Sequence, residues 1–392
     1  MEKQTIATST NYQKPDAYGA LSMPVYHCAS FEFDSAKNMS DVFCGRVLDP
    51  EYSRIMNPTV TFFEERVKSL TDASNVFAFN CGMAAITNAI MAVAKAGTNI
   101  VTSNHLFGNT VSLFRNTLGN FGVEVREVNL LEEESVRKAV DEKTCALFFE
   151  IITNPQMEVA DVRMLADVAH SHNVPVIADT TLIPFTEFDG RSLGMDVQVV
   201  SSTKYVSGGA TSLGGLVIDY GTFPVFNRRI RYELLFNLGG YMTPHAAYMQ
   251  TVGLESLDAR YRVQSSNALE LATRLQKVPQ IKRVNYTGLP DNPFYEIAKR
   301  QYGNTSGAML TIDLADKASA LRFIDRLKVI HRASNLFDNR SLAIHTASTI
   351  FGTFSGSQRR AMDVLDTTIR ISVGLEHVDD LYEDIVQAVQ EE

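Results

Sequence analysis

Lys204 is a candidate catalytic residue because it follows a strand-like apolar run at residues 197–200. It lies in a turn of small and hydroxylated residues, Ser-Ser-Thr-Lys-Tyr-Val-Ser-Gly-Gly, over positions 201–209. A lysine amine attacks a carbonyl only in its neutral form, and burial or a nearby charge lowers its pKa toward that condition. The position therefore suits a lysine that forms a Schiff base with a carbonyl compound. Taken alone, the pattern also fits an exposed lysine at a strand end.

A second strand end offers a place for a phosphate. The apolar run at residues 77–79 leads through a tight turn at Gly82 and Met83 into a helical pattern. The free N–H groups at the start of a helix, together with the helix dipole, attract a phosphate. Ser201 and Thr203, beside the candidate lysine, offer hydroxyl groups to the same ligand. By itself the turn at Gly82 also fits an ordinary strand-to-helix connection.

A third strand end carries a carboxylate. Asp179 follows directly after the apolar run at residues 174–178. An aspartate at this position could pair with a pyridine nitrogen and keep it protonated, so that the ring can accept electrons. Asp179 alone also fits a cap of the next helix. In combination with Lys204 and the phosphate-binding turn, it predicts pyridoxal 5'-phosphate (PLP) as the cofactor.

The elements that must position these groups alternate between strand and helix over residues 56–250. Continuously apolar strands that alternate with helices indicate a mostly parallel sheet with both faces covered, and ligands of such sheets bind at the carboxyl ends of the strands. Helical patterns cover Ala84–Ala94 and Met164–His172. The predicted strands are Val76–Phe79, Ile100–Thr102, Val123–Val125, Ala146–Phe149, Val174–Ala178, Val197–Val200 and Leu213–Ile218.

Two further regions flank this α/β domain. Residues 1–55 are predicted to form an irregular arm whose isolated aromatic residues need a neighbouring subunit, or the body of the same chain, to cover them. Residues 251–392 are predicted to form a smaller α+β domain that begins with one long helix at Leu254–Leu275. The predicted strands of this domain are Ile281–Tyr286, Ala308–Ile312 and Ile369–Val373, and two further helices are predicted near Lys317–Leu327 and Val378–Val389.

Composition excludes several classes of protein. The chain has 392 residues, 45% of them hydrophobic and 21% charged, as expected of a soluble globular protein with two or three domains. A net charge of -9 argues against nucleic acid as a partner. The four cysteines show no metal-binding or disulfide spacing, so we expect reduced thiols, no metal and a cytoplasmic location. The polar N-terminal stretch lacks the apolar core of a signal peptide, and the sequence has no apolar run of about 18 residues, so we expect no membrane partner.

The motifs, taken together, resemble those of the Cys/Met-metabolism family of PLP enzymes, the transsulfuration group. The segment at residues 52–59, Tyr-Ser-Arg-Ile-Met-Asn-Pro-Thr, matches the family element Y-S-R-x-x-N-P-T. The resemblance implies that Tyr52 and Arg54 reach the phosphate of the neighbouring subunit's cofactor, and that the enzyme is at least a dimer and, as in the family, a homotetramer. It implies the aspartate-aminotransferase-like fold, fold type I, over nearly the whole chain.

The resemblance also assigns roles to residues in the body of the chain. Gly82 and Met83 match the phosphate-binding turn of the family. Asn154, in an E-x-x-x-N-P element that begins at Glu150, is implied to contact the 3-hydroxyl of the cofactor and the substrate. Arg370 matches the arginine that binds the α-carboxylate of an amino-acid substrate, a bidentate task suited to a guanidinium group.

Two departures from the family pattern bear on the reaction. Phe107 occupies the position of a tyrosine in the family's L-Y-G-x-T element, so the ring that stacks on the cofactor lacks a hydroxyl group and a proton donor. A carboxylate departs from an ester with little protonation, whereas a thiolate leaving group needs more help from a proton donor. The loss of the hydroxyl group therefore favours an acyl-homoserine substrate. Asn109 stands where methionine γ-lyases usually have cysteine.

A C-terminal segment supports the same branch of the family. Residues 335–349 resemble the N-x-G-D-x-x-S-L-x-x-H-P-A-S-T segment of O-acetylhomoserine sulfhydrylases, with Phe337 in place of its glycine and Thr346 in place of its proline. Asn335 is expected beside Arg370 in the substrate-binding site.

The sequence thus predicts γ-replacement on an acyl-homoserine with sulfide or a thiol, which gives homocysteine in methionine and cysteine biosynthesis. A cystathionine or methionine γ-lyase remains an alternative within the family. A non-catalytic regulatory protein on the same fold is the alternative from another class, although loss of function usually removes the lysine that this chain retains.

Overall fold

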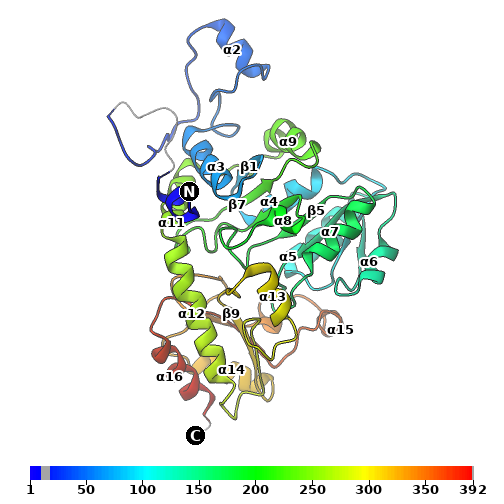
Figure 1. Cartoon of the computed structure of the whole chain (residues 1–392), viewed down its shortest axis with the longest axis vertical. Coiled ribbons are helices and arrows are strands. Elements are labelled where there is room, and N and C mark those ends of the chain that lie inside the picture. Colours follow the sequence, from blue (N-terminus) through cyan, green and yellow to red (C-terminus); the bar gives the residue numbers. More distant parts are fainter. Residues whose placement is uncertain (10–17, 391–392) are drawn as a thin grey trace.

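The structure is a computed structural model that describes residues 1–9 and 18–390. A seven-stranded sheet with the order β1-β7-β6-β5-β4-β2-β3 forms the centre of the molecule (Figure 1). Only β7 runs antiparallel to its neighbours, so the sheet is mostly parallel, as predicted. Its strands are β1 (Asn75–Phe79), β2 (Asn99–Thr102), β3 (Glu124–Glu127), β4 (Thr144–Glu150), β5 (Val176–Asp179), β6 (Val197–Val200) and β7 (Gly215–Asp219).

Alternate residues of these strands contribute to two separate hydrophobic cores, because successive side chains of a strand point to opposite faces. In β4, Phe148 packs in one core while Leu147 and Phe149 pack in the other. The first core lies against α4 (Gly82–Met91), and the second lies against α3 (Pro58–Thr71) and α7 (Val162–Ser171). Burial on both faces explains the continuous apolar runs of the sequence.

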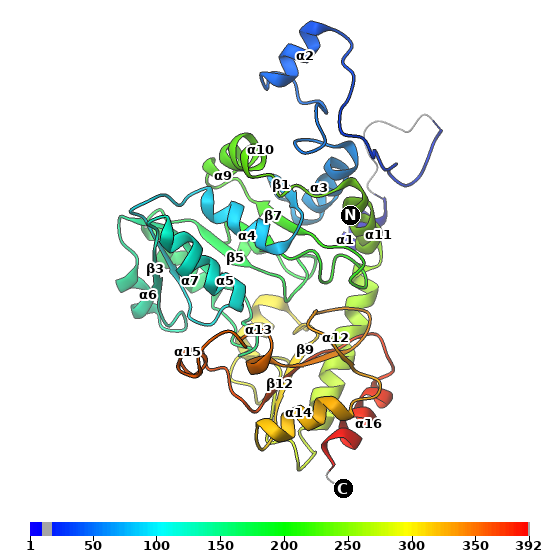
Figure 2. The same cartoon turned by 180° about the vertical axis from the view of Figure 1, so that it is seen from behind.

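A five-stranded sheet with the order β10-β11-β12-β9-β8 forms the C-terminal region, below the first sheet in Figures 1 and 2. Its strands are β8 (Arg283–Asn285), β9 (Met309–Asp313), β10 (His331–Arg332), β11 (Leu342–His345) and β12 (Thr368–Ser372). The core that covers one face of the large sheet continues into this region. Domain boundaries at 55/56 and 250/251 stay a prediction.

The remaining helices connect and cover the two sheets. They are α1 (Lys3–Ser9), α2 (Ala36–Phe43), α5 (Gly108–Ser112), α6 (Glu133–Ala139), α8 (Gly190–Leu193), α9 (Val225–Arg229), α10 (Leu235–Leu238), α11 (Pro244–Glu255), α12 (Leu257–Leu275), α13 (Tyr295–Tyr302), α14 (Lys317–Arg326), α15 (Gly356–Ala361) and α16 (Val378–Val389). Two π-helical turns, Leu113–Leu118 and Ile230–Leu234, and a 3₁₀ turn, Thr346–Ser348, complete the list of helical segments.

The predicted helix at Leu254–Leu275 is wrong at its start, where the structure has two helices. Ser256 separates α11 from α12 with a non-helical backbone (φ -108°, ψ 3°). Its hydroxyl accepts a hydrogen bond from Arg260 Nε, while Arg260 Nη2 donates to the carbonyl of Tyr205. The break therefore directs Arg260 to the residue that follows Lys204.

The N-terminal arm is less irregular than predicted, since it contains α1 and α2. Ser35 caps α2 by accepting a hydrogen bond from the backbone N–H of Asn38, and Lys37 pairs with Asp41 one turn later. The part of the arm that carries α2 projects from the body in both views (Figures 1 and 2). Within the described residues, no helix is both long enough and apolar enough to cross a membrane.

Candidate active site

The carboxyl ends of three parallel strands bring the candidate residues to one edge of the large sheet. β5 lies between β4 and β6, and Glu150, the last residue of β4, is in register with Asp179, the last residue of β5. β6 ends at Val200, four residues before Lys204. This is the edge at which open α/β sheets bind their ligands.

Lys204 is held in a buried, polar environment. Its Nζ donates a hydrogen bond of 2.7 Å to Oδ1 of Asn335, from the C-terminal region. Burial, and then the positive charge of Arg370, lower the pKa of Lys204 to about 8, although Asp179 acts in the opposite direction. A substantial fraction of the amine is therefore neutral near pH 7 to 8, which is the state that attacks a carbonyl.

Two carboxyl groups lie side by side next to the lysine. Burial raises the pKa of both Asp179 and Glu150, and the proximity of Asp179 raises that of Glu150 further. Asp179 accepts a hydrogen bond from the N–H of Thr181. A cation near these groups, such as a protonated pyridine nitrogen, would favour their ionised form.

Glu150 connects two predicted cofactor contacts, a role that the sequence did not reveal. Its Oε1 accepts from the backbone N–H of Phe107 at 2.5 Å, and its Oε2 accepts from that of Asn154 at 3.3 Å. A carboxyl group thus fixes both the residue predicted to stack on the cofactor and the residue predicted to contact its 3-hydroxyl. The E-x-x-x-N-P spacing was the available signal, but nothing in it indicates the contact with Phe107.

Arg370 lies at the other side of the candidate site, on β12. Its Nη1 donates to Oδ1 of Asn154 at 3.3 Å, and its Nη2 donates to the carbonyls of Ser334 at 3.1 Å and Asn335 at 3.3 Å. The Nε atom is buried and has no hydrogen-bond partner among the described residues. Burial lowers the pKa of Arg370 to about 9, so the group remains mostly cationic at neutral pH. A buried cation with a free donor suits the carboxylate of a substrate.

The turn at Gly82 forms the expected start of a helix. A Cβ on Gly82 would lie 2.7 Å from Cβ of Ser201, so only glycine permits this approach between the two segments. The N–H groups of Gly82 and Met83 and the hydroxyl of Ser201 make no hydrogen bond within the described part of the chain. These donors are free to bind a phosphate.

Thr203 is already engaged in a contact with the protein. Its hydroxyl donates to the carbonyl of Gly214 and accepts from the N–H of the same residue. A phosphate contact from Thr203 would require this hydroxyl to change partners, and the contact stays a prediction.

Tyr52 and Arg54 are not joined to this cluster by any hydrogen bond or ion pair of the described residues. Arg54 Nη1 donates to the carbonyl of Phe236, and its guanidinium lies 5.6 Å from the centre of the Tyr52 ring. Tyr52 is 45% exposed. Their predicted role, in the site of a neighbouring subunit, stays a prediction.

The geometry fits PLP. Lys204 supplies an amine of lowered pKa, the Gly82 turn supplies free phosphate donors, and Asp179 supplies a buried carboxyl group. Among residues 1–9 and 18–390, no three His, Cys, Asp or Glu side chains are grouped so as to hold a metal ion, and the four cysteines are free.

Comparison with known proteins agrees with this geometry. The family model described as Cys/Met metabolism PLP-dependent enzyme matches residues 4–390. The chain belongs to this family. It is PLP-dependent and has the fold type I architecture of its structural relatives.

Relatives of more than one activity resemble the chain. It is 34% identical to an O-acetyl-L-homoserine sulfhydrylase of Corynebacterium glutamicum, over 93% of this chain and 92% of the relative. It is 33% identical to an L-methionine gamma-lyase of Pseudomonas putida, over 98% and 96%. The crystal structure of a putative O-acetylhomoserine (thiol)-lyase from Campylobacter jejuni, which carries pyridoxyl-lysine-phosphate, has a TM-score of 0.95, 31% identity and coverage of 99% and 100%.

Proposed function

We propose that the protein is a PLP-dependent O-acetyl-L-homoserine sulfhydrylase. It replaces the acetate group on Cγ of the substrate by sulfide or a thiol, and the product with sulfide is L-homocysteine, an intermediate of methionine and cysteine biosynthesis. The observation that carries the choice within the family is Phe107, a ring without a hydroxyl group at the position predicted to stack on the cofactor. The resemblance to sulfhydrylases over nearly the whole chain supports the same choice.

When bound, PLP supplies an electron sink for charge that develops on the substrate. Lys204 would hold the cofactor through its amine and would act as the general base that takes protons from Cα and Cβ of the substrate. Its lowered pKa favours this role, because a base with a pKa near the working pH is neutral often enough to accept a proton. Asp179 would pair with the pyridine nitrogen and favour its protonated form, and Arg370 with Asn154 and Asn335 would bind the substrate.

The leaving group decides whether the missing hydroxyl matters. Acetate is a stable anion and departs without a proton, whereas a thiolate leaves more readily when a general acid assists. Phe107 offers no acid, so the site is better suited to an O-acyl substrate than to cystathionine or methionine. The γ-lyase activity remains the alternative, because a γ-lyase shares Lys204, Asp179 and Arg370 and a relative of that activity is 33% identical.

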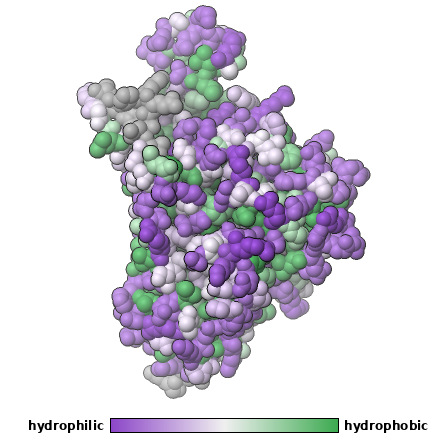
Figure 3. Space-filling model, viewed as in Figure 1, coloured by the Kyte–Doolittle hydropathy of each residue, from purple (hydrophilic) through white to green (hydrophobic). Residues whose placement is uncertain are grey.

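The active unit is proposed to be at least a dimer, and a homotetramer by resemblance to the family. The arm exposes large apolar side chains, and Figure 3 shows apolar residues on its surface. Leu21 is 98% exposed, Leu48 65% and Phe43 63%. A second copy would cover them and bring Tyr52 and Arg54 to its site. The cytoplasm as location rests on the sequence and is part of this proposal.

Product analysis tests the function. The purified enzyme is incubated with O-acetylhomoserine, O-succinylhomoserine, cystathionine or methionine, each with and without sulfide. We expect homocysteine from O-acetylhomoserine and sulfide, and little product from cystathionine or methionine. Lys204→Ala, the matched control, should bind PLP weakly and form no product, and borohydride should attach the cofactor covalently to the wild type but not to this variant. A wild type that cleaves cystathionine faster than it consumes either acylhomoserine would identify a lyase.

A further inference from the structure

Residues 334–341, here called the bridging segment, contact both ends of the candidate site. Asn335 Oδ1 accepts the hydrogen bond of Lys204 Nζ, and the carbonyls of Ser334 and Asn335 accept hydrogen bonds from Arg370 Nη2. The lysine and the arginine come from different sheets. The position of this segment therefore sets their separation.

Phe337 anchors the bridging segment to both sides. Its ring stacks on that of Tyr205, the residue after Lys204, with a centroid distance of 3.9 Å and an interplanar angle of 7°. Its backbone N–H donates a 2.7 Å hydrogen bond to the hydroxyl of Ser372, two residues after Arg370 on β12. The side chain is fully buried. Phe337 thus contacts a residue adjacent to Lys204 and a residue two positions from Arg370.

The backbone of Phe337 is strained. Its φ of 55° lies in the left-handed region, where a bulky residue is an outlier and glycine is favoured. Sulfhydrylases that the segment resembles have glycine at this position, so the chain carries a phenylalanine where glycine would be easier to fold. The parallel stack on Tyr205 is the contact that only the larger residue makes.

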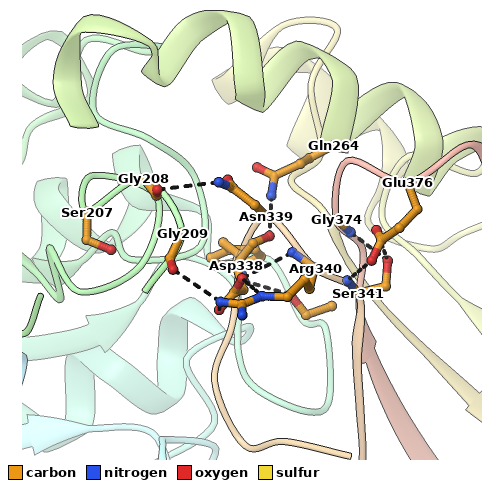
Figure 4. Close-up of polar contacts among 12 residues, drawn as sticks. Ser207, Gly208, Gly209, Gln264, Asp338, Asn339, Arg340, Ser341, Gly374 and Glu376 are labelled. Carbon is orange, nitrogen blue, oxygen red and sulfur yellow. Dashed lines mark hydrogen bonds and ion pairs between the residues drawn. The ribbon is translucent and has the colours of Figure 1, made fainter. Parts of the chain in front are cut away.

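The rest of the bridging segment binds the loop that follows Lys204 (Figure 4). Asn339 Nδ2 donates to the carbonyl of Gly208, and Arg340 Nη2 donates to that of Gly209, each at 3.4 Å. A Cβ on Gly209 would lie 2.8 Å from Asn339 Nδ2, which shows how closely the two segments approach.

On its other side the bridging segment is fixed to the C-terminal region. Gln264 of α12 donates to the carbonyl of Asp338 at 2.7 Å. Glu376, beyond β12, accepts from the N–H of Ser341 at 2.7 Å and from its hydroxyl at 2.8 Å (Figure 4). The segment is therefore held at several points, and within it Phe337 contacts both Tyr205, the residue after Lys204, and Ser372, two residues after Arg370.

We propose that Phe337 is a positioning residue that holds Lys204 and Arg370 at the separation required to bind the amine and the carboxylate of an amino acid at the same time. The proposal rests on the proposed function only in assuming an amino-acid substrate. It does not depend on the leaving group or on the sulfur donor.

The test uses the holoenzyme and glycine, which has an amine and a carboxylate but no leaving group. Glycine binding is followed by the change in absorbance of the bound cofactor. Phe337→Gly removes the ring and its stack on Tyr205 and relieves the backbone strain, while it keeps the N–H that donates to Ser372. We expect the Kd for glycine and the KM for O-acetylhomoserine to rise together by about tenfold or more, because small displacements of binding groups are costly.

A second variant keeps the test decisive if Phe337→Gly folds poorly. Tyr205→Leu removes the other ring of the stack, and we expect a similar rise in the Kd for glycine. Tyr205→Leu also removes the hydroxyl group that accepts a hydrogen bond from the N–H of Ala308. The double variant should therefore lose little more than Tyr205→Leu alone, because the ring stack is already absent in that variant. Phe323→Leu, at an equally buried phenylalanine of α14, is the matched control, and it should lower the melting temperature without changing the Kd.

The outcomes separate this proposal from the proposed function. A Kd for glycine that stays within about twofold of the wild type in a folded Phe337→Gly holoenzyme would overturn the positioning role, as would losses that multiply in the double variant. A wild type that binds glycine, shows the Phe337 effect and yet makes no homocysteine would refute the function and leave the positioning role intact.

Discussion

The charge balance around Lys204 governs how readily this amine reacts. Burial and Arg370 disfavour its protonated form, while Asp179 favours it, and the first two effects prevail. The amine thus combines a lowered pKa with a hydrogen bond to Asn335 that holds it in place.

The first prediction concerns the pH dependence of cofactor capture by the cofactor-free protein. Only the neutral amine reacts, so the rate should rise as pH increases through about 8, the pKa of Lys204, and level off above it. Arg370→Gln removes a positive charge that lowers this pKa, so the midpoint should move to higher pH. Stopped-flow absorbance measures both profiles. A wild-type midpoint near the ordinary lysine value of 10.5, unchanged in the variant, would contradict the assignment.

The second prediction concerns Phe107. Phe107→Tyr should change sulfhydrylation of O-acetylhomoserine little and should raise elimination from cystathionine, because general acid assistance is worth about 10²- to 10⁴-fold. Phe107→Ala removes the predicted stacking surface, so it should weaken cofactor binding and slow both reactions. Steady-state rates with both substrates, with cofactor content as the control, measure these effects. Equal gains in both reactions for Phe107→Tyr would show that the hydroxyl group does not act on the leaving group.

Local sequence patterns were sufficient to single out the candidate residues at strand ends. They were insufficient to predict contacts between segments that lie far apart in the sequence. Lys204 and Asp179 follow apolar runs that the sequence displays directly. The contact of Glu150 with Phe107 and the stack of Phe337 on Tyr205 join residues 43 and 132 positions apart along the chain. No periodicity encodes such contacts, because they depend on how the elements pack.

At the scale of elements, the strands of the large sheet were predictable, whereas several short elements elsewhere in the chain were not. All predicted strands of the large sheet overlap strands of the structure. Most of them are buried on both faces, which leaves continuous apolar runs, whereas the edge strand β3 is partly exposed. β10, with two exposed residues, and β11, within the motif-rich C-terminal segment, were not predicted. α2 was missed although Ser35 is a standard N-cap, since the surrounding polar residues mask its single apolar face.

The third prediction concerns His105, which lies after β2 and contacts one residue before α7 and one residue after α15. Its Nδ1 lies 2.7 Å from a carboxylate oxygen of Glu158, and its Nε2 lies 3.0 Å from one of Asp363. Both ring nitrogens donate only when the imidazole is protonated. Burial lowers the pKa of His105, but the hydrogen bonds and charges of the two carboxylates outweigh it, and the net pKa is raised.

A pKa raised on folding stabilises the protein below the unfolded pKa of 6.5, and this stabilisation is lost as pH rises through the folded value. His105→Gln should therefore lower the free energy of unfolding more at a pH of about 6 than at about 9. Urea denaturation at both pH values measures the difference. His245→Gln, at an exposed histidine of α11, is the control and should show no such dependence. An equal loss at both pH values for His105→Gln would exclude the charged contact.

At the scale of the whole molecule, the candidate site combines residues from both sheets. Asp179 is the last residue of β5 and Lys204 follows β6, both in the large sheet, whereas Arg370 belongs to β12 of the second sheet. The proposed oligomer would add Tyr52 and Arg54 from another copy. The sequence could suggest this only through its resemblance to the family, because an exposed aromatic arm does not by itself identify its partner.

The fourth prediction tests the shared site by complementation. Arg54→Ala and Lys204→Ala should each be inactive. Hybrid dimers formed by unfolding and refolding the mixture contain one site with both residues intact, and part of the activity should return. Refolded single variants are the controls. Full activity in a monomer, as measured by sedimentation during turnover, would contradict the model.

The central claim is that the enzyme performs replacement rather than elimination at Cγ. The most direct measurement is the partition of O-acetylhomoserine between homocysteine and 2-oxobutanoate as the sulfide concentration is raised. The account predicts that homocysteine becomes the main product and that 2-oxobutanoate falls as sulfide captures the activated substrate. If 2-oxobutanoate remains the main product at saturating sulfide, the enzyme is a lyase and the assignment is contradicted.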